Sequence, residues 1–120
     1  MLVTSVYRMT SPLPRWHDGP LVLVGDAAHT TGPSAGQGAS VALEDGVILA
    51  KCLRDIPDRD QAFATYHQLR VDRIQGLLDL SGRQIRTMNE AKAHADPSVR
   101  SFLYAHEIHW DEPIAAVPTS

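Results

Sequence analysis

The sequence predicts an α/β fold with one or two strands, a buried helix and a long C-terminal helix. Two observations support this prediction. The run Leu21–Val24 is apolar at every position, which is typical of a strand covered on both faces in a parallel sheet. Apolar residues then recur at steps of three and four over 37–54 and 59–89, the spacing of amphipathic helices. A strand covered on both faces needs neighbouring strands, and the sequence offers at most two strands. This indicates that the chain is part of a larger sheet.

The first quarter of the chain predicts strands joined by turns. The segment Val3–Met9 is rich in β-branched and aromatic residues and indicates a first short strand. Turn-forming residues, ending in Asp18-Gly19-Pro20, separate it from the apolar run Leu21–Val24. Small, polar and helix-breaking residues over 27–38 then predict a loop.

The rest of the chain predicts helices. The helix from about Gln37 to Arg54 has apolar residues over much of its circumference, so it is predicted to be largely buried. Pro57 ends it, and Asp58 is predicted to cap the next helix. That helix, 59–89, combines an apolar stripe with a solvated face to which its arginines are assigned: Arg59, Arg70, Arg73, Arg83 and Arg86. A short helix over 98–105 and an irregular tail follow the break at Asp96-Pro97.

Composition excludes several classes of protein. The chain has 11 Lys and Arg against 14 Asp and Glu, so no basic surplus favours nucleic-acid binding. The lone cysteine, Cys52, excludes an internal disulfide framework and an all-cysteine zinc site. No apolar stretch approaches the roughly 20 residues that span a bilayer, and the N-terminus lacks the pattern of a signal peptide. We therefore expect no membrane association and a cytoplasmic location.

The segment 21–44 carries the residues that indicate a ligand site. Asp26 follows the apolar run, at the end of a strand where open α/β sheets bind ligands. Gly36, Gln37 and Gly38 precede a helix, where glycines allow close approach to backbone N–H groups and the helix N-terminus adds unpaired donors. Pro33 stiffens the loop between them. A carboxylate and a donor cluster so placed suit opposite ends of an elongated polar ligand.

This segment resembles the second flavin-binding motif of the FAD-dependent aromatic hydroxylases, the group A flavoprotein monooxygenases typified by p-hydroxybenzoate hydroxylase. The residues that carry the resemblance are Gly25-Asp26-Ala27-Ala28-His29, Pro33, Gly36-Gln37-Gly38 and Glu44-Asp45. The approach to the motif, Pro14-Arg15-Trp16 and Gly19-Pro20, also matches, and the tail segment 108–111 is similar to endings of several bacterial members. The resemblance covers most of the chain, with its specific core over 15–53.

The resemblance implies a role for each motif residue. Asp26 would hydrogen-bond the ribityl chain of FAD, and Pro33 would lie beside the isoalloxazine ring. The backbone of Gly36, Gln37 and Gly38 would face the pyrimidine end of the flavin, where preorganised donors stabilise negative charge. No catalytic side chain and no metal ligand are implied. The family uses NAD(P)H and O2 to hydroxylate an aromatic or similar small organic substrate, with FAD as cofactor.

One family feature is not found in the sequence. The family opens with a strand and a Gly-x-Gly-x-x-Gly turn that holds the FAD pyrophosphate. The nearest pattern here, 36–41, has Val41 at the third glycine position. The resemblance therefore implies that residues 1–120 are the C-terminal portion of an FAD-binding monooxygenase domain. A missing N-terminal chain or segment is then the expected partner, and the portion is expected to be incomplete alone.

Three other functions fit parts of the sequence. Related FAD oxidoreductases, such as halogenases and reductases, use similar second motifs. The long helix over 59–89 also suits a non-catalytic relic or interaction module. Finally, Gly32–Gly36 formally fits the Gly-x-Ser-x-Gly elbow of serine hydrolases, with Ser34 as nucleophile. That elbow needs a strand running directly into the serine, whereas here a loop intervenes, so the hydrolase is disfavoured.

Several histidines could be functional or structural. His29 lacks a partner at metal-ligand spacing, so we expect a packed or hydrogen-bonded loop residue. His106 and His109, close to Asp111 and Glu112, superficially suggest a metal cluster. Their place in the tail favours the reading that they hold no metal.

The remaining polar residues have bland alternatives. Arg15 and Trp16 are expected to be structural, with cofactor contact as the alternative. Glu44 and Asp45 either polarise the site or occupy solvated or capping positions on the polar edge of their helix. Cys52, on a helix predicted to be buried, is expected to be an inert core thiol.

Overall fold

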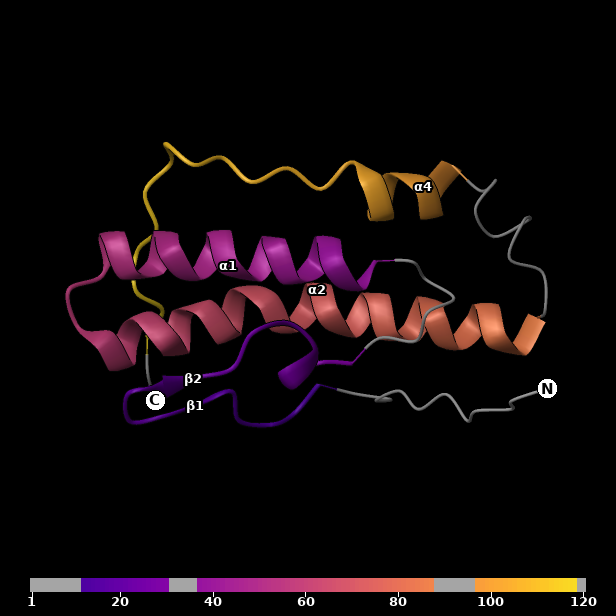
Figure 1. The fold of residues 1–120 in the computed structure, drawn as a ribbon. Helices are drawn as coiled ribbons and strands as arrows, with labels where there is room; N and C mark the ends of the chain where they lie inside the picture. Colours follow the sequence, from indigo (N-terminus) through magenta and orange to yellow (C-terminus); the bar gives the residue numbers. More distant parts are fainter. Residues whose placement is uncertain (1–11, 31–36, 88–96, 119–120) are drawn as a thin grey trace.

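The computed structural model describes residues 12–30, 37–87 and 97–118, without the side chains of 81–87. Two strands, β1 (His17–Asp18) and β2 (Leu21–Val22), are followed by a short 3-10 turn, η1 (Gly25–Ala27). The helices are α1 (Gly38–Asp55), α2 (Arg59–Thr87) and α4 (Pro97–Tyr104). Figure 1 shows α1 and α2 side by side, with the β1–β2 hairpin beside α2 and the C-terminal tail running along α1. The predicted strand Val3–Met9 lies outside the described residues.

The predicted helices are confirmed to within a residue or two at the ends that the structure describes. α1 ends at Asp55, two residues before Pro57. The Asp58 carboxylate accepts the backbone N–H of Gln61 at 2.8 Å, so Asp58 caps α2 as predicted. Two strands, the helix α1 and the long helix α2 are the elements of the predicted fold class. Among the described helices, none has the length and apolar character needed to cross a membrane.

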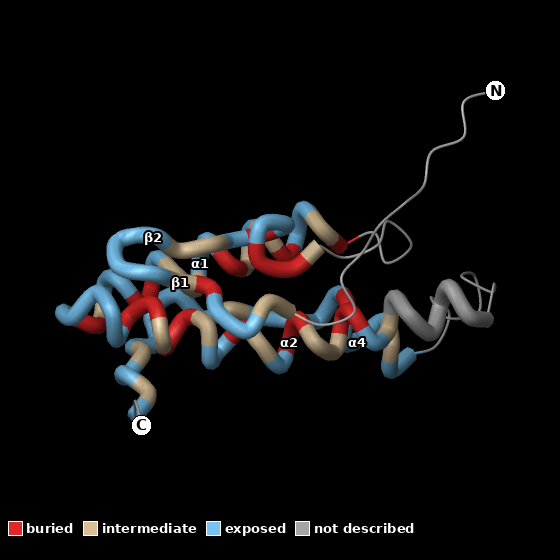
Figure 2. The backbone as a smooth tube through the Cα atoms, turned by 90° about the horizontal axis from the view of Figure 1, so that it is seen from below, coloured by how far each residue is buried: buried red, intermediate tan, exposed pale blue. Residues whose placement is uncertain are grey.

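The core lies where α1, α2 and the segment before η1 meet, and Figure 2 shows the buried parts of the chain gathered there. Trp16 is fully buried, and its indole N–H donates to the carbonyl of Leu13 at 2.9 Å. Its ring stacks on His67 of α2, with 4.8 Å between centroids. Trp16 is therefore structural, as predicted. The apolar core around it includes Val41, Cys52, Tyr66, Ile74, Leu77 and Leu78.

The prediction of a central parallel strand is wrong for the described part of the chain. β2 pairs antiparallel with β1, with Asp18 opposite Leu21. Gly19, whose φ is +54°, turns the chain back so that the apolar run meets the residues just before it. Leu21 is 61% exposed, because no other described segment covers that face of the hairpin.

Within the described part of the chain, α1 is less buried than the sequence predicts. α1 buries one face, through Val41, Asp45 and Cys52. The outer face of α1, formed by Leu43, Val47 and Leu53, is exposed, with Leu43 at 73%. α2 and η1 pack on the opposite face of α1, and among the described residues these three apolar side chains remain exposed.

The C-terminal tail is hydrogen-bonded to the helix pair. The Arg54 guanidinium donates to the carbonyl of Trp110 at 2.8 Å and lies 4.5 Å from the centroid of its ring. The Asp55 carboxylate accepts the backbone N–H of Ile114 at 2.9 Å. Trp110 and Ile114 are thus held on α1 by their backbone hydrogen bonds to charged side chains, whereas the Val117 N–H bonds to the Thr65 hydroxyl on α2.

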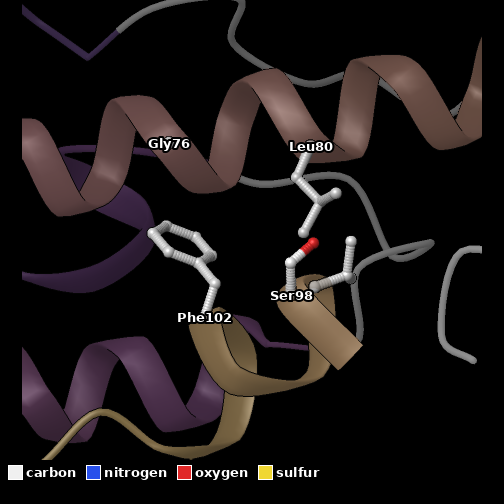
Figure 3. Close-up of a pocket in the computed structure, with 5 residues that line it drawn as sticks. Gly76, Leu80, Ser98 and Phe102 are labelled. Atoms are coloured by element: carbon white, nitrogen blue, oxygen red, sulfur yellow. The ribbon is translucent and has the colours of Figure 1, made fainter. Parts of the chain in front are cut away.

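α4 packs on α2 around a glycine. In Figure 3 the Phe102 ring points toward Gly76, and a Cβ at Gly76 would lie 2.7 Å from the ring. Leu80 and Val99 help to line the open, largely apolar hollow of about 240 Å³ beside this contact. The absence of a side chain at Gly76 therefore allows the aromatic ring to approach the helix.

Replacing Gly25 with alanine is predicted to destabilise the fold. The φ of Gly25 is +62°, where other residues lose about 1–2 kcal/mol, and its Cβ would lie 3.1 Å from that of Ala42. Gly46→Ala is the control, because a Cβ there meets nothing within 4 Å and alanine favours a helix by about 1 kcal/mol. Urea unfolding should show opposite signs for the two variants. Equal stability of Gly25→Ala and the wild type would contradict the strained backbone.

Candidate functional site

Asp26 lies on η1, directly after the hairpin. The carbonyl of Gly25 accepts the N–H groups of Ala28 and His29, each at 3.0 Å, which closes the turn. The Thr30 hydroxyl donates to the backbone carbonyl of Asp26 at 2.9 Å. The Asp26 side chain is exposed, so its carboxylate is available to a ligand on the outside of a turn whose own backbone is hydrogen-bonded.

The turn sits against the N-terminal half of α1. Gly25 contacts Ala42, which follows Gly38 by four residues, about 6 Å along the helix axis. Gln37 is the N-cap: its side chain is buried and makes no capping hydrogen bond, while its carbonyl accepts the N–H of Val41. The first N–H groups of α1 and the Asp26 carboxylate are therefore at the same end of the helix. Pro33 and Gly36, the other predicted site residues, lie outside the described residues.

A buried carboxylate fastens this turn to α1. Asp45 is fully buried, and its Oδ2 accepts the backbone N–H of Gly25 at 2.9 Å. The same oxygen pairs with Nε2 of His29, which is also buried. The other oxygen, Oδ1, accepts Nε–H of Arg70 at 2.7 Å. One side chain thus joins both ends of the Gly25–His29 loop to α1 and α2.

A second carboxylate extends the network toward α4. Glu44 accepts from Arg70 Nη2 at 2.8 Å and from Arg73 Nη2 at 2.9 Å. Arg73 also donates to the carbonyl of Phe102 on α4. His106 Nε2 is 3.7 Å from the Glu44 carboxylate. Hydrogen bonds and ion pairs therefore connect η1, both long helices and α4.

The placement of these charged residues corrects two expectations. Arg70 and Arg73 are 1% and 9% exposed, so they do not lie on a solvated face. Asp45 is in the core and ion-paired, neither solvated nor capping. A signal was present in the sequence, because Arg70 and Arg73 continue the three- and four-residue steps from Tyr66 to Leu77. His29 is a buried, hydrogen-bonded loop residue, as predicted.

The other candidate residues take no part in this network. Arg15 is exposed and pairs with Asp18 at 2.7 Å. His109 lies 3.7 Å from Glu107, and no group of three metal-ligating side chains occurs in the ranges that the structure describes. Cys52 is a buried core residue, as predicted, and burial raises its pKa to about 11, so the thiol is protonated at neutral pH. Ser34 lies outside the described residues.

Both acidic residues of the network are charged at neutral pH. Burial raises the pKa of Asp45, but hydrogen bonds from His29, the Gly25 N–H and Arg70 outweigh it, and the net pKa lies below its usual value. Glu44 follows the same pattern. Burial raises its pKa, but the guanidinium groups of Arg73 and Arg70 lower the pKa by more than burial raises it. Hydrogen bonding, rather than solvent, therefore keeps these carboxylates ionised.

Acid is predicted to destabilise the fold through Glu44 and Asp45. Their folded pKa values lie below the unfolded values of 4.5 and 3.8, so their contribution to stability is complete above these values. It is lost as the pH falls through the lower folded values. Urea unfolding from pH 7 to pH 3 should show this loss, with a smaller slope in Asp45→Asn. Asp18→Asn, in an exposed pair, should keep the wild-type slope, and an unchanged slope in Asp45→Asn would contradict the assignment.

Comparisons with known proteins find monooxygenases and hydroxylases among the relatives. The chain is 47% identical over 64 residues to 6-hydroxynicotinate 3-monooxygenase of Pseudomonas fluorescens, covering 52% of this chain and 17% of the relative. It is 48% identical over 94 residues to kynurenine 3-monooxygenase of Salinispora tropica, covering 72% and 21%. It is 37% identical over 94 residues to FAD-dependent urate hydroxylase of Mycolicibacterium vanbaalenii, covering 78% and 23%. The matches thus span about a fifth of each relative.

The family comparison agrees with these relatives. No solved structure matches the chain. Residues 4–81 match the family described as FAD binding domain, which includes β1, β2, η1, α1 and most of α2. This match covers more than half of the chain, and the chain therefore belongs to the FAD binding domain family, whose cofactor is FAD.

Proposed function

We propose that η1 and the N-terminus of α1 bind FAD in a flavoprotein monooxygenase that hydroxylates an aromatic or similar small organic substrate. The observation that carries this proposal is the exposed carboxylate of Asp26 on a turn anchored by buried contacts. The turn lies at the end of α1 where the first N–H groups, beginning at Gly38, have no partner within the helix. Asp26, Pro33, Gly36, Gln37 and Gly38 are the proposed cofactor-binding residues.

These residues fit the chemistry of the flavin. The ribityl chain carries hydroxyl groups, for which the Asp26 carboxylate is a strong charged acceptor. The pyrimidine end carries carbonyl oxygens, for which the amides at Gln37 and Gly38 are donors. FAD would supply the redox chemistry, with NAD(P)H as reductant and O2 as oxygen source. The chain's own part is to hold and orient the cofactor.

The reaction is proposed from the relatives. Their names describe monooxygenases or hydroxylases of hydroxynicotinate, kynurenine and urate. The matches span 17–23% of these relatives. The activity, the substrate class and the NAD(P)H requirement are therefore proposed for the whole protein and not for these 120 residues alone. The cytoplasmic location remains part of the same proposal.

The domain assignment is a proposal of the same kind. Residues 1–120 would be the C-terminal portion of an FAD-binding monooxygenase domain. The exposed outer face of α1 offers the apolar surface that a dinucleotide-binding βαβ unit would cover. Such a unit would supply the pyrophosphate site, which the pattern 36–41 does not provide.

Removing the Asp26 carboxylate is predicted to weaken FAD binding. A hydrogen bond to a charged acceptor contributes about 1.5–3 kcal/mol, so Asp26→Ala should raise the dissociation constant at least about tenfold. The measurement is fluorescence titration of FAD with the 120-residue chain. Because the Asp26 side chain is exposed, urea unfolding should be nearly unchanged.

Two further measurements make this test decisive. Asp18→Ala removes an exposed carboxylate from the neighbouring hairpin and should leave FAD affinity unchanged. The Asp26→Ala pair is also measured in a chimera, in which the matching residues of this chain replace those of the hydroxynicotinate relative. Equal FAD affinity with and without the Asp26 carboxylate in both settings would refute the proposed role.

A further inference from the structure

Arg70 has no role in the proposed cofactor contacts, yet it is among the most buried charged residues. It is 1% exposed and lies on α2. Its Nε–H donates to Asp45 Oδ1 at 2.7 Å and its Nη2 donates to Glu44 Oε2 at 2.8 Å. One guanidinium group thus donates to the carboxylates of two adjacent residues of α1, a geometry that a lysine ammonium cannot reproduce.

Asp45 connects Arg70 to η1. Its two oxygens face different partners: Oδ1 faces Arg70, whereas Oδ2 faces the Gly25 N–H and His29. The terminal torsion of aspartate has a broad energy minimum, so α1 alone does not fix the carboxylate plane. Because the carboxylate is planar, holding Oδ1 also sets where Oδ2 lies.

We infer that Arg70 is a positioning residue for the flavin-binding turn. By orienting Asp45, it fixes the Gly25 amide and hence the direction in which Asp26 leaves the turn. The flavin part of this inference rests on the proposed function, whereas the effect on Gly25 does not. The assignment also explains why Arg70 is buried against Asp45, a carboxylate 25 residues earlier in the sequence.

Arg73 provides the matched control. It lies three residues after Arg70 on the same helix, is 9% exposed, and donates to Glu44 and to the carbonyl of Phe102. Among the described contacts, none joins Arg73 to Asp45. A purely structural role predicts similar effects for the two arginines, whereas a positioning role predicts that only Arg70 affects Gly25.

The experiment compares Arg70→Lys with Arg73→Lys in the ¹⁵N-labelled 120-residue chain. Amide hydrogen exchange and the chemical shift of the Gly25 N–H report its bond to Asp45. Arg70→Lys should speed Gly25 exchange roughly tenfold relative to the α1 core amides, and Arg73→Lys should leave that ratio unchanged. FAD titration should show a roughly tenfold weaker affinity for Arg70→Lys, a loss comparable with that of supporting residues at metal sites.

Each outcome decides the inference. Unchanged Gly25 exchange in Arg70→Lys, or equal changes in both variants, would overturn it. If Arg70→Lys does not fold, Arg70→Met combined with Asp45→Asn removes both charges together, and unchanged Gly25 exchange there would overturn it as well.

The flavin measurement separates this inference from the proposed function. If Asp26→Ala does not alter FAD affinity, the proposed function fails, while Gly25 exchange still decides whether Arg70 positions the turn. If Asp26→Ala weakens FAD binding but Arg70→Lys leaves it unchanged despite faster Gly25 exchange, the positioning role toward FAD is overturned and the proposed function stands.

Discussion

The structure depends on the burial of one negative charge, the carboxylate of Asp45. A carboxylate removed from water is strongly destabilising unless donors replace its hydration. Here a backbone amide from Gly25, a ring nitrogen from His29 and a guanidinium from Arg70 do so. These donors come from both ends of one loop and from a separate helix, so satisfying the charge brings together η1, α1 and α2. The requirement of Gly25 for a positive φ follows, because the turn must present its amide to this oxygen.

The same network fixes how the two long helices align. Apolar side chains in a helix pair tolerate small displacements, whereas hydrogen-bonded ions do not. Arg70 and Arg73 meet Glu44 through separate nitrogens, and Arg73 continues to the Phe102 carbonyl. Sliding α2 along α1 would leave a buried charge without a partner. The ion pairs therefore define one register for the pair and attach α4 to it, while Ile74, Leu77 and Leu78 contribute the hydrophobic stabilisation.

Local features of the sequence were sufficient to predict the helices, and long-range contacts were not. Pro57 and Asp58 determine a helix end and a helix start through their own backbone chemistry, so the junction could be predicted. The position of Asp26 on a turn after an apolar run also follows from neighbouring residues. The burial of Arg70 could not be inferred by assigning charged residues to solvent, because its partners lie 25 and 26 residues away. The antiparallel hairpin was missed because an all-apolar run does not reveal which segment it pairs with.

α1 turns two acidic side chains toward the rest of the chain and exposes several apolar ones. Glu44 and Asp45 point toward the other elements, whereas Leu43, Val47 and Leu53 are exposed. Burying apolar surface stabilises by about 25 cal/mol per Å², and monomers rarely expose large contiguous apolar patches. A helix that buries one face against α2 and η1 and exposes Leu43, Val47 and Leu53 on the other is therefore best explained as an internal helix with partners on both sides. This supports the proposal that the remainder of an FAD-binding domain packs on the outer face of α1. In that arrangement α1 would separate the remainder of the domain from η1, which Asp45 holds on the inner face of the helix.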